Sequence, residues 1–197
     1  MDKVKAHAKE QKQIYIHNDI DQAAFYFKER IEARASKRDR DGIGYDMMAC
    51  LIFLAFAVEA KFNFVGYKLI KDWDERKPAL DKVEIVLEHL KIDSDLKEWP
   101  YQVIGELKKF RDALAHGKPE EIDREVYIET TAKELQERGS LSAPYEDFLK
   151  EELVYQAYED VEAIWKELLE RSGLNITDTI TQGGIEYRII EEISDSG

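Results

Sequence analysis

The chain has 197 residues, of which 44% are hydrophobic and 36% are charged, and its formal net charge is −13. This apolar fraction excludes an intrinsically disordered chain, and the length suits one well-cored domain or a core domain with an appendage. The single cysteine, Cys50, excludes an intrachain disulfide and favours a reducing, cytoplasmic setting.

Membrane insertion is not expected from the sequence. No signal peptide is visible, and the longest uninterrupted apolar run, residues 47–58, is shorter than the roughly 20 residues that cross a bilayer. We therefore expect this run to lie in a buried helix of a soluble, cytoplasmic protein.

The acidity belongs to the C-terminal part of the chain. Residues 1–118 carry 22 basic and 21 acidic side chains, whereas residues 119–197 carry 7 and 21. Strong acidity disfavours binding to RNA, but this objection does not apply to the nearly neutral N-terminal part. We expect a helical bundle core over residues 1–120 and an acidic extension over residues 121–197 that packs on the same domain.

Helical periodicity dominates the N-terminal part. Apolar residues at helical spacing predict helices over residues 8–35, 45–73, 79–90 and 101–116. The second of these is hydrophobic nearly all round and should be central in a bundle. The polar run at residues 36–46 predicts a loop, and its two glycines lack the preceding strand that a nucleotide-binding loop needs.

Glu59 and Asn63 interrupt the central helix one turn apart. A buried carboxylate without a partner is costly, so Glu59 should meet a cation, and Arg111 is the candidate. The alternative interpretation is that Glu59 marks the point where the helix emerges into solvent. The sequence leaves both open.

The helix at residues 101–116 carries reactive side chains at its carboxyl end. Its apolar positions form one stripe, while Asp112 and His116 project from the opposite face at a spacing that suits a hydrogen bond. Gly117 and Pro119 end the helix directly after His116. Histidine exchanges protons near neutral pH, so His116 is a candidate proton shuttle.

Basic side chains make this helix end locally cationic. They are Lys108, Lys109, Arg111 and Lys118, against the single acid Asp112. We expect an anionic ligand to be attracted here, and the planar guanidinium of Arg111 suits a phosphate.

The pattern changes beyond residue 120. Residues 124–131 predict either a short strand or the start of a helix, and residues 145–171 have the periodicity of a long acidic helix that packs on the bundle. The last stretch alternates across a Gln-Gly-Gly turn and predicts a hairpin with strands near 175–181 and 185–191. The expected fold class is all-α, an up-and-down helical bundle with a small C-terminal β-hairpin.

Arg111, a polar residue, three further residues and then His116 at the end of a bundle helix resemble the Arg-x4-6-His signature of the HEPN superfamily. Many members of that family are metal-independent RNases of toxin, phage-defence and RNA-processing systems, and others are inactive relatives used for dimerisation or nucleotide binding. The resemblance covers roughly residues 10–120 in architecture and only the motif in sequence. It implies a homodimer in which two copies of the motif helix approach across a two-fold axis.

The leading prediction is therefore a metal-independent endoribonuclease of toxin or phage-defence type that acts on RNA without a cofactor. His116 would move protons, Arg111 would hold the scissile phosphate, and Asp112 would orient the imidazole. Glu59 and Asn63 would support Arg111. The alternative is a catalytically inactive helical module that dimerises and binds a partner protein or a nucleotide, and an antitoxin or other regulatory protein is a candidate partner. The histidines show no metal-ligand spacing, so no metal is expected.

Overall fold

The computed structural model describes residues 3–119, 121, 123, 125–137 and 143–193, and these residues are mostly helical. In chain order the elements are β1 (Lys3–Gln13), α1 (His17–Ser36), α2 (Ile43–Leu69), α3 (Ala79–Leu90), α4 (Gln102–Ala115), α5 (Ala132–Glu137), α6 (Glu151–Ser172) and β2 (Gln182–Ile193). Short 3-10 segments lie at Pro144–Phe148 and Ile176–Thr179. The prediction of a helical fold with a small antiparallel sheet is confirmed.

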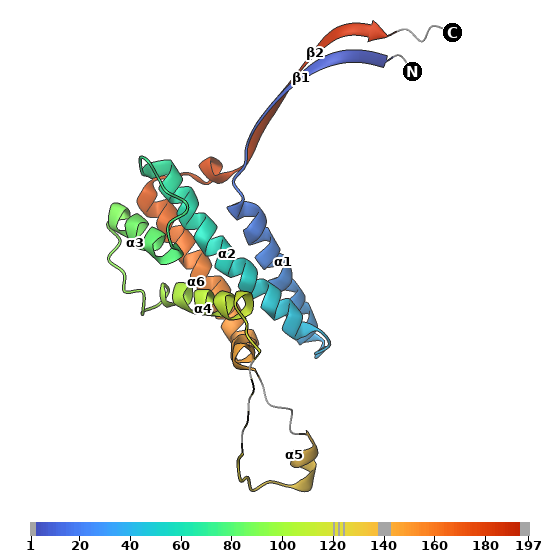
Figure 1. Ribbon diagram of the computed structural model, residues 1–197, viewed down its shortest axis with the longest axis vertical. Coiled ribbons are helices and arrows are strands. Elements are labelled where there is room, and N and C mark those ends of the chain that lie inside the picture. The colour runs from blue at the N-terminus through green and yellow to red at the C-terminus, as the bar shows by residue number, and fades with distance from the viewer. Residues whose placement is uncertain (1–2, 120, 122, 124, 138–142, 194–197) are drawn as a thin grey trace.

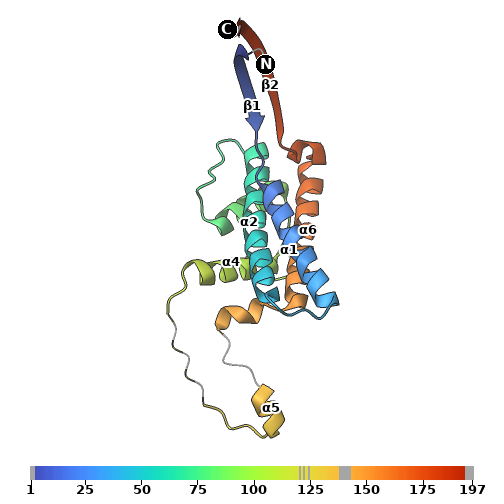
Figure 2. The same ribbon diagram turned by 90° about the vertical axis from the view of Figure 1, so that its right-hand side faces the viewer.

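Helix α2 lies at the centre of the helical body. It packs against α1, α3, α4 and α6. Helices α1, α2 and α6 run side by side along the body, whereas α4 crosses them (Figure 1, Figure 2). The body therefore departs from a simple up-and-down bundle at α4. Because α2 is apolar nearly all round, only a surround of several helices removes its surface from water.

Charged side chains on the buried surface of α2 are paired with neighbouring helices. Asp46, 5% exposed, forms salt bridges with two arginines of α1. The ammonium of Lys61, 1% exposed, lies 2.7 Å from a carboxylate oxygen of Asp21 on α1 and 3.0 Å from one of Glu162 on α6. A buried charge is tolerated only when it is paired, so these contacts set how α1 and α6 sit on α2.

Among the described residues, α2 is the one helix that is long and apolar enough to cross a membrane by length and composition alone. The run at residues 47–58 is thus only part of a longer apolar helix. In the fold, 56% of the apolar window of α2 is buried, and the core helix of a soluble protein passes the same test of length and composition. A cytoplasmic location stays a prediction.

The two strands form an arm that projects from the helical body and brings the two ends of the described chain together (Figure 1, Figure 2). Strand β1 pairs with β2 antiparallel, from Lys3 opposite Ile193 to Gln13 opposite Gln182. The sheet therefore contains the expected C-terminal strand, but its partner is the N-terminal strand and not residues 175–181. The helix predicted from residue 8 begins at His17.

The residues of the two strands explain why a turn was predicted at Gly183 and a helix from residue 8. Gly183, predicted to lie in a turn, stands inside β2, where an added Cβ would meet the Gln11 carbonyl oxygen of β1 at 3.0 Å. The two strands approach closely at this point, so glycine, which has no side chain, fits here. Residues 3–13 are rich in alanine and lysine, which suit helices, and their partner lies at the other end of the chain. No local signal reports such a distant partner.

The arm has one apolar face and one largely charged face. Opposed residues share a face of the ribbon, and the apolar face includes the pairs Ala6 with Ile189 and Ala8 with Tyr187. Ile189 and Tyr187 are 61% and 69% exposed. A two-stranded ribbon alone is at best marginally stable in water, and this one has an uncovered apolar face.

The remaining elements follow the predictions with small changes at their ends. Helices α3 and α4 correspond to the predicted ranges 79–90 and 101–116, and the long acidic helix is α6. The central helix ends at Leu69, four residues before the predicted residue 73. Residues 125–131 form neither a strand nor a helix, and α5 begins after them.

We expect Phe62→Ala to destabilise the fold strongly. Phe62 on α2 is 1% exposed, and truncation of a buried phenylalanine costs about 3–5 kcal/mol of unfolding free energy. Phe56 on the same helix is 43% exposed and gives a matched control, so Phe56→Ala should cost much less. Urea titrations followed by circular dichroism measure both variants, and equal losses would contradict the packing described for α2.

Candidate active site at the end of helix α4

The apolar side of α4 fixes the helix against the core. Val103, Leu107 and Phe110 are each at most 3% exposed. At the carboxyl end His116 is the capping residue, and its backbone N–H donates a 2.9 Å hydrogen bond to the Asp112 carbonyl oxygen. The helix therefore ends at the histidine, as the following Gly and Pro predict.

The guanidinium of Arg111 is held by two carboxylates. Its Nη1 donates to Glu59 Oε2 at 3.1 Å, which is one of the two alternatives that the sequence left open. Its Nε and Nη2 both donate to Asp112 Oδ1, at 3.1 and 2.9 Å. The side chain is 23% exposed, so its position and its orientation are both defined while one edge still reaches solvent.

Glu59 has a second cationic partner that the sequence analysis missed. The ammonium of Lys82 on α3 donates to Glu59 Oε1 at 2.6 Å and to the Glu75 carbonyl oxygen at 3.0 Å. Lys82 is 1% exposed, and Glu59 keeps 30% exposure. Helical periodicity could have indicated this lysine, because it falls four residues before the buried Val86 on the apolar stripe of α3.

Asp112 does not have the partner that was expected. Its carboxylate accepts hydrogen bonds from Lys108 and Arg111, and these two contacts, the lysine first, hold the pKa of Asp112 below its ordinary value. Among the described hydrogen bonds, its contact with His116 runs through the backbone alone. Among the described hydrogen bonds, the Asp112 carboxylate thus contacts Arg111 and Lys108 and does not contact the imidazole as predicted.

His116 is exposed and lines a hollow of about 490 Å³. Lys118 shares this hollow, and its far wall comes from residues 143–145, at the start of the 3-10 segment Pro144–Phe148. Arg111 lines a different and much smaller hollow with Glu59 and Lys108. Within one protomer, the arginine and the histidine of the motif therefore open onto different depressions.

The basic side chains around the motif are divided among these surfaces. Lys108 pairs with Asp112, and Lys118 lies beside His116. Lys109 lines a third hollow, of about 250 Å³, together with Phe110 and other residues. The predicted cationic cluster is thus a spread of positive charge around the helix end.

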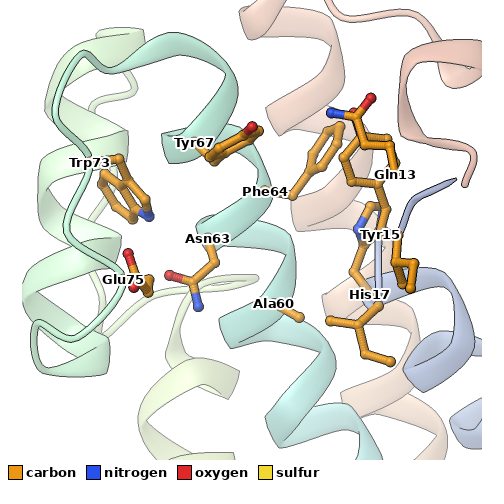
Figure 3. Close-up of a pocket in the computed structure, with 11 residues that line it drawn as sticks. Gln13, Tyr15, His17, Ala60, Asn63, Phe64, Tyr67, Trp73 and Glu75 are labelled. Atoms are coloured by element: carbon orange, nitrogen blue, oxygen red, sulfur yellow. The ribbon is translucent and has the colours of Figure 1, made fainter. Parts of the chain in front are cut away.

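Asn63 does not support Arg111. Its amide lines a separate pocket that also contains Trp73 and Glu75 (Figure 3), and its Oδ1 atom is buried without a hydrogen-bond partner. Glu59 and Asn63, one turn apart on α2, thus line different pockets. The prediction holds for the contact of Glu59 and is wrong for that of Asn63.

Charged groups from three helices alternate in sign through the site. In order of contact they are Lys82, Glu59, Arg111, Asp112 and Lys108, which is three cations against two anions. Such a network can accept an anion at its exposed edge. Within the described residues, no group of three or more His, Cys, Asp or Glu side chains is placed to hold a metal ion.

Comparisons of the chain with protein-family models, with curated proteins and with solved structures find no match. Membership of the HEPN superfamily therefore stays a prediction that rests on Arg111, His116 and the helix that carries them.

Proposed function

We propose that the protein is a metal-independent endoribonuclease of the toxin or phage-defence type, related to the HEPN superfamily. The observation that carries the proposal is the arginine held by two carboxylates close to an exposed histidine at the same helix end. Four residues lie between Arg111 and His116, and this step of five positions is about 7.5 Å along a helix axis. At this spacing, Arg111 could bind the phosphate of an RNA phosphodiester while His116 transfers a proton to or from it.

RNA supplies its own nucleophile, the 2′-hydroxyl. Cleavage then needs a group that moves protons and a cation that stabilises the charge developing on the phosphate. His116 removes the 2′-hydroxyl proton or protonates the leaving 5′-oxygen. Arg111 binds the non-bridging phosphate oxygens. The products are a 2′,3′-cyclic phosphate and a free 5′-hydroxyl.

The contacts of Arg111 leave it able to bind a phosphate. Glu59 and Asp112 use three of its five N–H groups, so one N–H remains on each terminal nitrogen. A cation whose orientation is set before the substrate arrives needs little reorganisation during the reaction. Lys118 and Lys109 add positive charge along the path of an RNA backbone.

A homodimer would complete this site. Because Arg111 and His116 of one protomer open onto different hollows, a second protomer could bring its own histidine to the arginine. Two copies of α4 that approach across a two-fold axis make this exchange reciprocal. Each of the two sites then combines the arginine of one protomer with the histidine of the other.

The alternative proposal is a catalytically inactive module that binds a partner protein or a nucleotide. The specific observation in its favour is that Glu59 and Asp112 already pair with Arg111. The acidic residues 119–197 would suit a basic partner, such as a regulatory protein or an antitoxin. The apolar face of the arm is a further surface that such a partner could cover.

We expect His116→Ala to lower RNA cleavage by about 10²–10⁴-fold, the usual loss for a proton shuttle, with the fold intact. Arg111→Lys should also lower the cleavage rate, because the lysine ammonium is a point charge and lacks the planar set of donors of the guanidinium. Exposed His89 on α3 provides the matched control, His89→Ala. Cleavage of end-labelled RNA in EDTA measures these rates and identifies the cyclic phosphate. A requirement for magnesium, or undiminished cleavage in the double variant Arg111→Ala with His116→Ala, would refute the proposal.

We expect the chain to be a dimer of two 23.0 kDa subunits in light scattering at micromolar concentration. Mixing Arg111→Ala with His116→Ala subunits should restore part of the activity, since one site of each mixed dimer would combine an intact arginine with an intact histidine. A monomer would contradict the dimer. A dimer without restoration would show that each site uses residues of one protomer.

A further inference from the structure

The pocket that contains Asn63 has a volume of about 440 Å³ and lies where the arm joins the helical body (Figure 3). Its walls come from the segment that links β1 to α1, from α2, and from the turn that follows α2. Aromatic rings form much of the lining, including those of Tyr15, Phe64, Tyr67 and Trp73. A concave, mainly apolar site with a few polar groups is the usual form of a small-molecule site.

Three buried polar atoms in this pocket have no hydrogen-bond partner. They are His17 Nε2, Asn63 Oδ1 and Trp73 Nε1, and five such side-chain atoms occur in all among the described residues. His17 is only 2% exposed. Buried polar atoms in native proteins are nearly always paired, so their concentration in one cavity indicates a ligand that pairs them.

The polar groups lie on different sides of the cavity. In Figure 3, Trp73, Glu75 and Asn63 gather on one side and Tyr15 and His17 on the other. The indole N–H of Trp73 needs an acceptor, and the Asn63 oxygen needs a donor. A ligand edge that carries an acceptor next to a donor would satisfy both.

The pocket favours a ligand that is neutral where it is buried. Burial first, and then the charge of Lys61, lower the pKa of His17 to about 4, with a smaller opposing effect from Asp19. The imidazole is therefore uncharged at neutral pH. Glu75, which also lines the pocket, further disfavours an anion.

The aromatic walls favour a planar ring. The rings of Tyr15 and Phe64 meet edge to face with centroids 5.0 Å apart, and that of His17 lies 4.6 Å from Phe64. Flat ligands gain from stacking and edge contacts with such walls. An aliphatic chain would fill the space but leave the three polar atoms unpaired.

Trp73 holds its position because of a glycine on α2. A Cβ added at Gly66 would lie 2.5 Å from the Trp73 ring, so only glycine lets the indole lie against the helix. Glycine inside a helix is unfavourable, and its presence here accounts for the placement of one wall. Gly44 on the same helix has open space around it, which makes Gly44→Ala a matched control for Gly66→Ala.

We propose that this pocket binds a purine-type base: a neutral, planar heterocycle with a hydrogen-bond acceptor and donor next to each other on one edge. The base could belong to a free nucleoside or nucleotide, or to an RNA strand. Neither Arg111 nor His116 lines this pocket, so binding of a base here does not rest on ribonuclease activity.

Isothermal titration with adenosine, guanosine and a short purine-rich RNA tests the proposal on the full chain. Indole is the control for ring stacking without the paired edge, and ribose 5-phosphate is the control for the phosphate. Trp73→Phe removes the indole N–H and Asn63→Leu removes the side-chain amide, and each should weaken binding at least about tenfold. Trp99→Phe, at a 65% exposed tryptophan elsewhere, should leave binding unchanged, as should Gly44→Ala, whereas Gly66→Ala should weaken it.

Each outcome has a defined meaning. Binding of a nucleoside, or of the RNA alone, that is weakened by Trp73→Phe and Asn63→Leu supports the pocket and distinguishes a free ligand from an RNA base. Indole binding as tightly as the purines would show that the polar edge is not used. Competition by ribose 5-phosphate, affinities unchanged in both variants, or no binding at millimolar concentration would each overturn the proposal. Thermal unfolding of every variant confirms that the loss is not one of folding.

Discussion

The need to bury most of the apolar surface of α2 determines how the helical body is built. This helix is apolar nearly all round, so α1, α3, α4 and α6 must all pack on it. Its few charged residues cannot reach bulk water freely and need partners from the covering helices. Lys61 and Glu59 meet this need with carboxylates of α1 and α6 and with cations of α3 and α4. The ion pairs thus specify which helix lies where, a task that apolar packing alone does poorly.

The candidate site follows from the same requirement. Glu59 is a half-buried carboxylate on α2, and its pairing with both Lys82 and Arg111 fastens α3 and α4 to the central helix. Removing one partner of such a network leaves the remaining charges uncompensated, which is costly. The contact by which Glu59 holds α4 on the central helix is therefore the same contact that positions Arg111.

The sequence predicted the parts that depend on local periodicity. The ranges of α3 and α4 and the central place of α2 follow from apolar spacing. The contact of Glu59 with Arg111 was one of two alternatives that the sequence left open. The pairing of β1 with β2 could not be predicted, because it joins the two ends of the chain and its alanines suit a helix equally well. The partners of Asp112 and Asn63 were missed for another reason. Lys108 competes for the carboxylate at helical spacing, and the turn carrying Trp73 and Glu75 folds back on Asn63.

Arg111 and His116 are held in opposite ways, and this contrast bears on the two proposed functions. The arginine is fixed by two carboxylates, whereas the histidine stands exposed at the helix terminus. Three cations face two anions in this network, which leaves one net positive charge among its five members. That surplus attracts an anion to the place where the remaining N–H groups of the arginine are available. A cation held in place and an exposed histidine at the same helix end are the two groups that the proposed cleavage of a phosphodiester needs.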